Sequence, residues 1–131
     1  MKRVIVEKLP QTREIDGAKR WTEEKGEFVQ ISYREEIGHL AFFELKRGHQ
    51  RGNHYHERKE EVFYIIGGQI RAVFLDVDSA EKEEQMLTKG DKVRVATRVG
   101  HVFYGIDDAF VIEYSPQYYD REDTYSMSLG D

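Results

Sequence analysis

Short runs of β-branched and aromatic residues, separated by glycines or charged turns, recur along most of this chain. Strand side chains alternate with period two, whereas an amphipathic helix needs an apolar period near 3.6 over at least ten residues. Almost no segment of this sequence has the helical period. We therefore predict a mostly β chain, with strands at residues 4–7, 28–33, 40–46, 62–66, 70–76, 92–96, 101–104 and 110–114.

Turn signals lie between these runs, at residues 47–48, 67–68, 89–90 and 105–108. Short turns of this kind join antiparallel strands, whereas parallel strands need longer crossover connections. Eight or more short strands linked in this way suit a closed barrel or a jelly roll. The sequence thus predicts an all-β antiparallel barrel whose turns form hairpins.

Size and composition restrict the class of protein. The chain has 131 residues, of which 39% are hydrophobic and 34% charged, values typical of one globular domain. The net charge of −5 is spread along the chain without a basic stripe, which argues against a nucleic-acid partner. No apolar run is long enough for a signal peptide or a membrane span, so we expect a soluble, cytoplasmic protein with no membrane partner. One domain should span residues 1–131, with its barrel at about 28–115 between an N-terminal strand and a polar C-terminal tail.

Three of the five histidines lie in an arrangement that suits a metal ion. His54 and His56 are two residues apart, so on an extended chain both imidazoles project to the same face. A carboxylate follows at Glu60 or Glu61, and His101 opens a later predicted strand. Because the chain has no cysteine, any metal must bind through nitrogen and oxygen. Three imidazoles and one carboxylate suit one divalent transition metal, namely zinc, iron, nickel or manganese, with positions open to water or substrate.

The segment that holds these residues resembles the first motif of the cupin superfamily. That motif is a glycine, five residues, HxH, three or four residues, a glutamate, six residues and a glycine. Residues 48–68, GHQRGNHYHERKEEVFYIIGG, fit this motif throughout. Glu60 with Gly67 and Glu61 with Gly68 both meet the spacing, and Glu61 is favoured because it corresponds to the commoner form in the family.

The second cupin motif is kept only in part. Gly90 and His101 match it, whereas its proline, second glycine and asparagine are replaced by Ala96, Arg98 and Gly105. The resemblance implies a cupin-type β-barrel or jelly roll, that is, a double-stranded β-helix. It also implies that the metal ligands are His54, His56, Glu61 and His101.

Residues 51–56, RGNHYH, are similar to the corresponding segment of cupins of nucleotide-sugar and capsule metabolism. One such group is the metal-binding cupin domain attached to capsule-synthesis reductases. The other is the thymidine-diphosphate-sugar 3,4-ketoisomerases, whose RGxHAH histidines are catalytic rather than metal-binding. The resemblance implies a carbohydrate-like ligand and leaves open whether a metal acts as Lewis acid or His54 or His56 moves a proton while Arg51 stabilises charge.

Three classes of function fit these residues. They are a metal-dependent isomerase or epimerase acting on a small oxygenated molecule, a metal-dependent dioxygenase, and a non-catalytic ligand-binding cupin. Strand parity with Glu61 predicts that Phe63 and Ile65 face inward. The polar candidates for catalysis or ligand orientation are Glu60, Arg51 and Tyr104, with Glu44, Arg71 and Arg94 as further possibilities. We also expect a twofold homodimer, the commonest assembly of soluble proteins.

Overall fold

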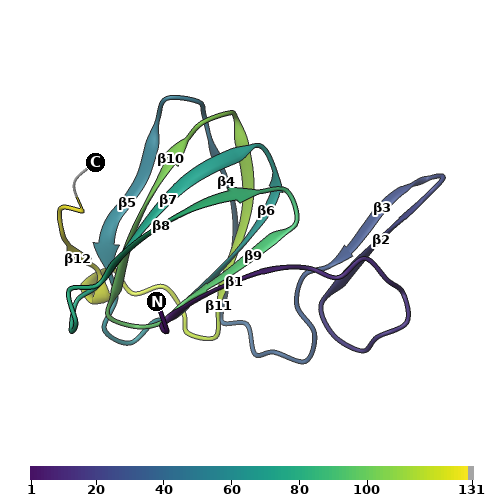
Figure 1. Ribbon diagram of the computed structural model, residues 1–131. Helices are drawn as coiled ribbons and strands as arrows, with labels where there is room; N and C mark the ends of the chain where they lie inside the picture. Colours follow the sequence, from purple (N-terminus) through teal and green to yellow (C-terminus); the bar gives the residue numbers. More distant parts are fainter. Residues whose placement is uncertain (130–131) are drawn as a thin grey trace.

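Two five-stranded antiparallel sheets face each other in the computed structural model, which describes residues 1–129 (Figure 1). The first sheet has the strand order β1-β9-β6-β11-β4, and the second has the order β12-β5-β10-β7-β8. In chain order the strands are β1 (Val4–Lys8), β2 (Lys19–Glu23), β3 (Gly26–Gln30), β4 (His39–Leu45), β5 (Gln50–Tyr55), β6 (Glu61–Gly67), β7 (Gln69–Asp76), β8 (Lys82–Thr88), β9 (Asp91–Val95), β10 (Val99–Gly105), β11 (Ala109–Ser115) and β12 (Tyr125–Ser126). This arrangement confirms the predicted all-β, cupin-type jelly roll.

Each of the eight predicted strands overlaps an observed strand, while β2, β5, β8 and β12 were not predicted as strands. The β8 sequence, KEEQMLT, is mostly charged or polar, so its propensity for strand is weak. It becomes a strand because it pairs with the buried strand β7 along seven residues. Tertiary pairing therefore outweighs local propensity at this edge of the second sheet.

None of the four glycine turns forms a hairpin, contrary to the prediction from the sequence. The four turns at residues 47–48, 67–68, 89–90 and 105–108 each connect a strand of one sheet to a strand of the other. Among the described strands, only β2 with β3 and β7 with β8 are sequential antiparallel neighbours. A short turn predicts a reversal of chain direction, but it does not tell whether the next strand pairs in the same sheet.

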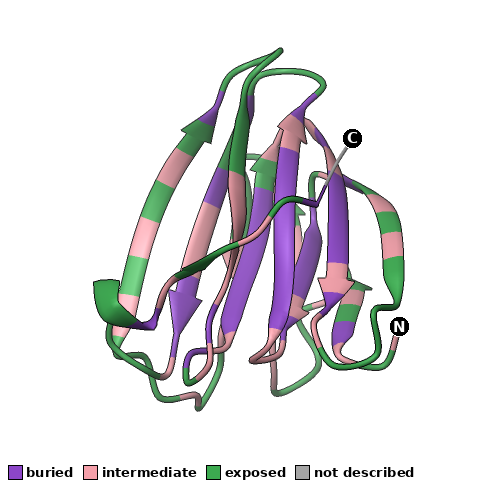
Figure 2. Cartoon of the chain, turned by 90° about the vertical axis from the view of Figure 1, so that its left-hand side faces the viewer, coloured by how far each residue is buried: buried purple, intermediate pink, exposed green. Residues whose placement is uncertain are grey.

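The core lies between the two sheets and is formed by the inward-facing side chains of both. Phe63 and Ile65 belong to this core, as strand parity with Glu61 predicts. Figure 2 shows that buried residues are concentrated in the central strands and that exposed residues alternate along the strands at the edge. The interior positions are nearly all apolar, so the few polar side chains that point inward require explanation.

The N-terminal region divides between the barrel and a projecting arm. Strand β1 pairs with β9 and belongs to the first sheet. Strands β2 and β3 form a separate two-stranded sheet that extends away from the barrel (Figure 1). Residues 28–30, which were expected at the start of the barrel, lie in this arm.

The C-terminal segment crosses the outer face of the second sheet (Figure 2). It contains a short 3₁₀ helix, η1 (Arg121–Asp123), and then β12, which pairs with β5. Leu129 packs against Val73 and Val102 on that outer face. In residues 1–129 no helix is long and apolar enough to cross a membrane.

Candidate metal centre

His54, Glu61 and His101 converge inside the barrel, although they come from three strands and from both sheets. Their ligand atoms all lie within 4.8 Å of one another. His54 on β5 and His101 on β10 are direct cross-strand partners in the second sheet. Glu61, the first residue of β6, belongs to the facing sheet. The three side chains can therefore reach a single ion.

A β-bulge in β5 decides which side chains face this centre. His101 lies opposite His54 and Val102 lies opposite Gly52, so Asn53 is an extra residue without a partner in β10. The φ angles are 116° at Gly52 and 64° at Asn53. The bulge turns Arg51 and His54 toward the same cavity, although residues three apart on a regular strand face opposite sides.

His56 approaches the same carboxylate. Its Nε2 atom is 3.3 Å from Oε1 of Glu61, and its Nδ1 atom is 2.7 Å from the backbone carbonyl oxygen of Asp123. Because a carbonyl can only accept, Nδ1 carries a hydrogen and Nε2 is the atom that faces Glu61. Burial acts to lower the pKa of His56, but the contact with Glu61 outweighs it and raises this pKa, so in the metal-free chain a protonated Nε2 faces the carboxylate. The three-residue cluster does not include His56. The structure therefore brings three of the four predicted ligands together and places the fourth against the shared carboxylate.

The charge states in the centre follow from burial. Burial lowers the pKa of His54 and lowers that of the fully buried His101 to about 4. Burial alone raises the pKa of Glu61, but the interaction with His56 and the nearby positive charges outweigh it and bring this pKa to about 2. At neutral pH the centre thus offers two neutral imidazoles and an ionised carboxylate, the forms that bind a divalent metal.

Two buried nitrogen atoms test whether a metal fits. Nε2 of His56 and Nδ1 of His101 have no hydrogen-bond partner within the described part of the chain. Buried polar atoms are nearly always paired, so these two nitrogens lack the partners that a folded protein normally supplies. A cation next to Glu61 would be a partner for both nitrogens. A donor set of imidazoles with one carboxylate suits zinc, iron, nickel or manganese.

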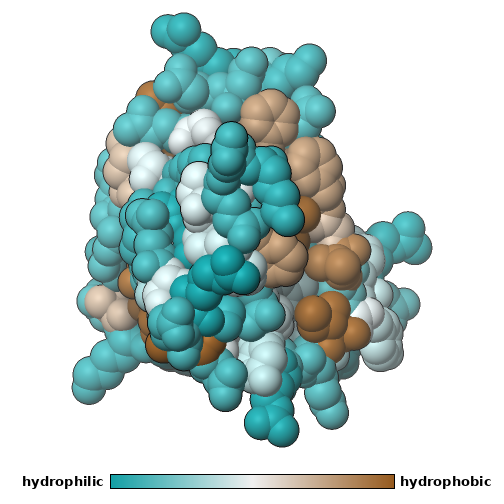
Figure 3. Space-filling view, turned by 90° about the vertical axis from the view of Figure 1, so that its right-hand side faces the viewer, coloured by the Kyte–Doolittle hydropathy of each residue, from teal (hydrophilic) through white to brown (hydrophobic). Residues whose placement is uncertain are grey.

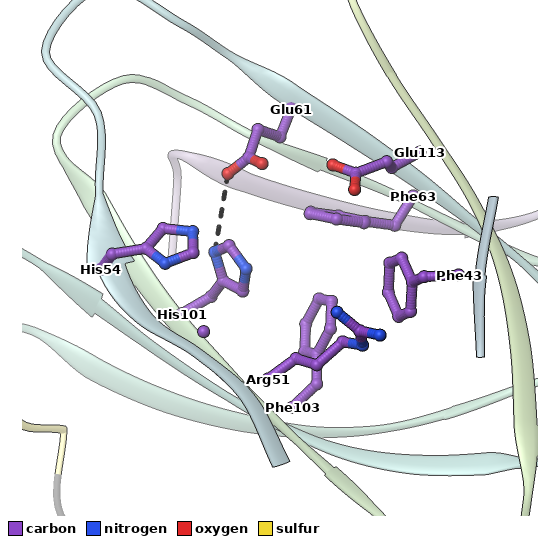
Figure 4. A pocket seen from close by; sticks show the side chains of 9 residues that line it. Phe43, Arg51, His54, Glu61, Phe63, His101, Phe103 and Glu113 are labelled. Atoms are coloured by element: carbon purple, nitrogen blue, oxygen red, sulfur yellow. Dashed lines mark ion pairs between the residues drawn. The ribbon is translucent and has the colours of Figure 1, made fainter. Parts of the chain in front are cut away.

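A cavity of about 240 Å³ opens beside the cluster. Figure 4 shows His54, His101 and Glu61 on one side, with Nδ1 of His101 and Oε1 of Glu61 joined by a dashed line at 3.7 Å. Three aromatic rings and Arg51 lie on the other side, and the guanidinium stacks 5.0 Å from the ring centre of Phe43. The remaining aromatic rings are those of Phe63 and Phe103. The cavity therefore combines an apolar wall, a cation and the candidate metal-ligand cluster of His54, Glu61 and His101.

Glu113 is a cavity residue that the sequence analysis did not single out. It lies on β11 opposite Phe63 and points into the cavity near Glu61 (Figure 4). Burial, followed by the charge of Glu61, raises the pKa of its carboxyl. The strand pattern contained a signal, because Glu113 has the same parity as Val111 on the apolar side of a predicted strand.

Two of the three predicted catalytic residues lie outside the cavity. Glu60 precedes β6 and binds Arg94, with 2.9 Å between Oε1 and Nη1. Tyr104 lies on the face of β10 opposite to Phe103, where Arg71 stacks 4.3 Å from the centre of its ring. The reason in both cases is strand parity, since a shift of one residue moves a side chain to the other face. Of the three, only Arg51 lines the cavity.

Two further residues beside the centre occupy no fixed position of either cupin motif. Lys59, in the loop before β6, has a side chain only 5% exposed, and its Nζ is 3.8 Å from Oε2 of Glu61. Asp123, in η1, accepts hydrogen bonds from the backbone N–H groups of Glu57 and Arg58. No spacing rule in the sequence links either residue to the histidines. Only the path of the chain brings them there.

A family model and a curated relative match most of this chain. The family model for the polysaccharide biosynthesis C-terminal domain matches residues 21–125. A curated relative, the UDP-2-acetamido-2,6-beta-L-arabino-hexul-4-ose reductase of Pseudomonas aeruginosa, is 32% identical over 114 residues. That alignment covers 82% of this chain but only 30% of the reductase, so the chain spans about a third of the length of its relative.

Solved structures of low sequence identity share the fold. A dTDP-4-dehydrorhamnose 3,5-epimerase from Sulfolobus tokodaii has a TM-score of 0.78 at 17% identity, covering 98% of this chain and 78% of its own. A sugar 3,4-ketoisomerase from Thermoanaerobacterium thermosaccharolyticum has a TM-score of 0.75 at 13% identity, covering 95% and 87%. The capsular polysaccharide assembling protein CapF of Staphylococcus aureus has a TM-score of 0.64 at 23% identity, covering 85% of this chain and 34% of its own. The chain therefore belongs to the polysaccharide biosynthesis C-terminal domain family and has the cupin jelly-roll fold.

Proposed function

We propose that this domain binds one divalent transition metal and uses the adjacent cavity to bind or convert a carbohydrate-like molecule. The observation that carries the proposal is the convergence of His54, Glu61 and His101 within 4.8 Å. His56 is the fourth proposed ligand, because its unpartnered Nε2 faces the same carboxylate. Zinc, iron, nickel and manganese all suit this donor set.

The proposed ligand class rests on the cavity and on the relatives. The cavity has aromatic walls and one guanidinium, a combination that suits a small oxygenated ring carrying polar or anionic groups. The curated relative is named as a reductase of a UDP-linked sugar, and two solved structures are a sugar epimerase and a sugar ketoisomerase. A keto-sugar or a similar nucleotide-linked sugar is therefore the class of molecule to test first.

The cavity residues suggest how such a molecule would be handled. A bound divalent metal would act as a Lewis acid toward a carbonyl oxygen of the ligand. Arg51 would hold an anionic or hydroxyl group at the aromatic side of the cavity. Glu113, a half-buried carboxyl with a raised pKa, takes the place of Glu60 as the group suited to exchange a proton with the ligand.

Metal analysis of protein purified without a histidine tag tests this proposal. We expect near-stoichiometric metal in the wild type and almost none in the His54→Ala, His56→Ala double variant. His49→Ala is the matched control, because His49 is exposed and lies outside the cluster. Iron in the wild type would call for an assay of oxygen consumption, since a metal-dependent dioxygenase needs a redox-active ion.

A metal-free keto-sugar isomerase is the second candidate. It is favoured by the contact of His56 with Glu61 and by the hydrogen bond of its other nitrogen to Asp123, which together resemble an oriented general base. The solved ketoisomerase shares the fold along 95% of this chain. Isomerase activity in protein that remains metal-free after reconstitution would select this candidate over the first.

We also propose that the protein forms a homodimer. Leu40, Phe42 and Phe110 are exposed on β4 and β11, and β4 is an edge strand of its sheet. The rings of Phe42 and Phe110 stack with their centres 6.4 Å apart. Figure 3 shows hydrophobic side chains gathered along one side of a mostly hydrophilic face. A monomeric mass in solution at micromolar concentration would contradict this proposal.

A further inference from the structure

A second cavity, of about 380 Å³, lies against the metal-ligand cluster. It shares His54, Glu61 and Glu113 with the first cavity, so both meet at the cluster. The other residues that line it are His39, Ala41, His56, Lys59, Tyr119 and Thr124. The first cavity has an aromatic wall, whereas the second combines groups that can donate hydrogen bonds with the carboxyl groups of Glu61 and Glu113.

Lys59 is the charged group of this second cavity. Its side chain is 5% exposed, and its Nζ lies 3.8 Å from Oε2 of Glu61, beyond hydrogen-bond distance. Within residues 1–129 this Nζ has no hydrogen-bond acceptor, and it lies 5.2 Å from the ring centre of Tyr119. A buried ammonium normally makes close hydrogen bonds as well as an ion pair, so Lys59 keeps unused donor capacity.

Thr124 is an independent sign of a missing ligand in the same cavity. Its hydroxyl oxygen is buried and has no hydrogen-bond partner within the described residues. A hydroxyl can donate one hydrogen bond, and His39 lines the same cavity. The unpartnered hydroxyl and the buried ammonium therefore face one cavity, where an acceptor could satisfy both.

The charge balance around Glu61 indicates the sign of that acceptor. In the metal-free chain, Glu61 is the counter-ion of Lys59. A divalent metal on the same carboxylate would leave one negative charge between a dication and the ammonium of Lys59. Charges in a partly buried site are poorly screened, so the pair of cations favours entry of an anion.

We infer that the second cavity is an oxyanion-binding subsite, in which Lys59 and Thr124 hold a carboxylate or phosphate group beside the metal. This inference rests on the proposed metal site and adds a chemical requirement to it. The ligand should carry an oxyanion that reaches the cluster from the side of Lys59, while Arg51 serves the opposite cavity.

Cobalt titration of the metal-free protein tests the inference, because the visible absorption of Co²⁺ reports both metal binding and changes in its surroundings. The titration is run in buffer without coordinating anions, and then with acetate or with inorganic phosphate at matched ionic strength. We expect either anion to shift the Co²⁺ spectrum and to tighten apparent Co²⁺ binding by about tenfold, since ligands that bind together stabilise each other. The stronger of the two responses identifies the carboxylate or the phosphate as the preferred group.

Two substitutions locate the response. Lys59→Met should bind Co²⁺ at least as tightly as the wild type, because a cation beside the metal is removed, and should lose the response to anions. Thr124→Val preserves the shape of the side chain and should weaken the response to anions. It provides the test of the subsite if Lys59→Met does not fold. Lys89→Met is the control for net charge, because Lys89 is exposed and pairs with Glu27 on the arm.

The outcomes separate this inference from the proposed function. If the wild type does not bind Co²⁺, the metal proposal fails before any anion is added. If the wild type binds Co²⁺ but no anion alters its spectrum or affinity, the subsite is wrong and the metal site stands. An anion response that survives in both Lys59→Met and Thr124→Val would also overturn the subsite.

Discussion

Replacement of Asp123 by alanine should disturb the proposed metal centre, although Asp123 is neither a proposed ligand nor part of a cupin motif. Its side chain is buried, and its two carboxylate oxygens accept hydrogen bonds from the backbone N–H groups of Glu57 and Arg58, at 3.0 and 3.1 Å. Its backbone carbonyl accepts the hydrogen of His56 Nδ1 at 2.7 Å. One residue of the C-terminal segment thus holds both the loop after β5 and the ring of a proposed ligand.

The size of the effect follows from these contacts. A hydrogen bond to a charged group contributes roughly 1.5–3 kcal/mol, and the two contacts of this carboxylate are partly buried and not additive. We expect Asp123→Ala to lower the free energy of unfolding by about 2–4 kcal/mol. The carbonyl of residue 123 remains in the variant, but the carboxylate that fixes its position is lost. Metal affinity should therefore fall by about tenfold, the lower end of the loss seen when a group that orients a metal ligand is removed.

Urea unfolding of the metal-free protein measures the first effect, and metal titration under native conditions measures the second. Glu122→Ala is the matched control, because Glu122 is the exposed neighbour of Asp123 in η1 and should change stability by less than about 0.5 kcal/mol. The reasoning is refuted if Asp123→Ala unfolds at the same urea concentration as Glu122→Ala. Loss of stability with unchanged metal affinity would refute only the link from Asp123 to His56.

Three other perturbations test separate parts of the structure. His101→Ala should bind metal far more weakly while circular dichroism still reports a folded barrel, because the apolar strands form the core. Gly52→Ala should lower stability and metal affinity together in thermal and titration assays, because a Cβ there would overlap the carbonyl of His101. Glu35→Gln should be less stable than the wild type at pH 7, with the difference shrinking between about pH 4.5 and 2. Burial acts to raise the pKa of Glu35, but hydrogen bonds from Ser32, Tyr114 and Arg94 lower it to about 2. This carboxylate therefore stabilises the fold above its unfolded pKa and ceases to do so as pH falls through the folded value.

The choice between Glu60 and Glu61 shows what motif spacing can predict and where strand parity is also needed. Both residues satisfied the cupin spacing, and strand parity allowed only one of them to point inward. The structure places Glu61 in the cluster and leaves Glu60 bound to Arg94 outside the cavity. The same parity explains why Tyr104 lies outside the cavity, because its neighbour Phe103 lines the cavity. Once strand boundaries are known, such alternatives can be decided from sequence.

The bulge at Asn53 could not be predicted from the sequence by strand parity. On a regular strand Arg51 and His54 would face opposite sides, and both reach the cavity only because one extra residue interrupts the pairing of β5 with β10. Whether a strand contains a bulge depends on the strand beside it. The turns have the same limit as the bulge. Their glycines predict that the chain reverses direction, but not the sheet in which the next strand pairs.

By itself, the sequence determined the all-β class, the cupin motif and the histidines and glutamate at its centre, because these depend on period-two patterns and fixed spacings within short segments. Only the tertiary structure brought Lys59, Glu113 and Asp123 to that centre. Lys59 lies within the first cupin motif but at none of its fixed positions, Glu113 comes from a strand of the first sheet, and Asp123 comes from the C-terminal segment. Their positions depend on how distant segments pack together, a property of the whole folded chain.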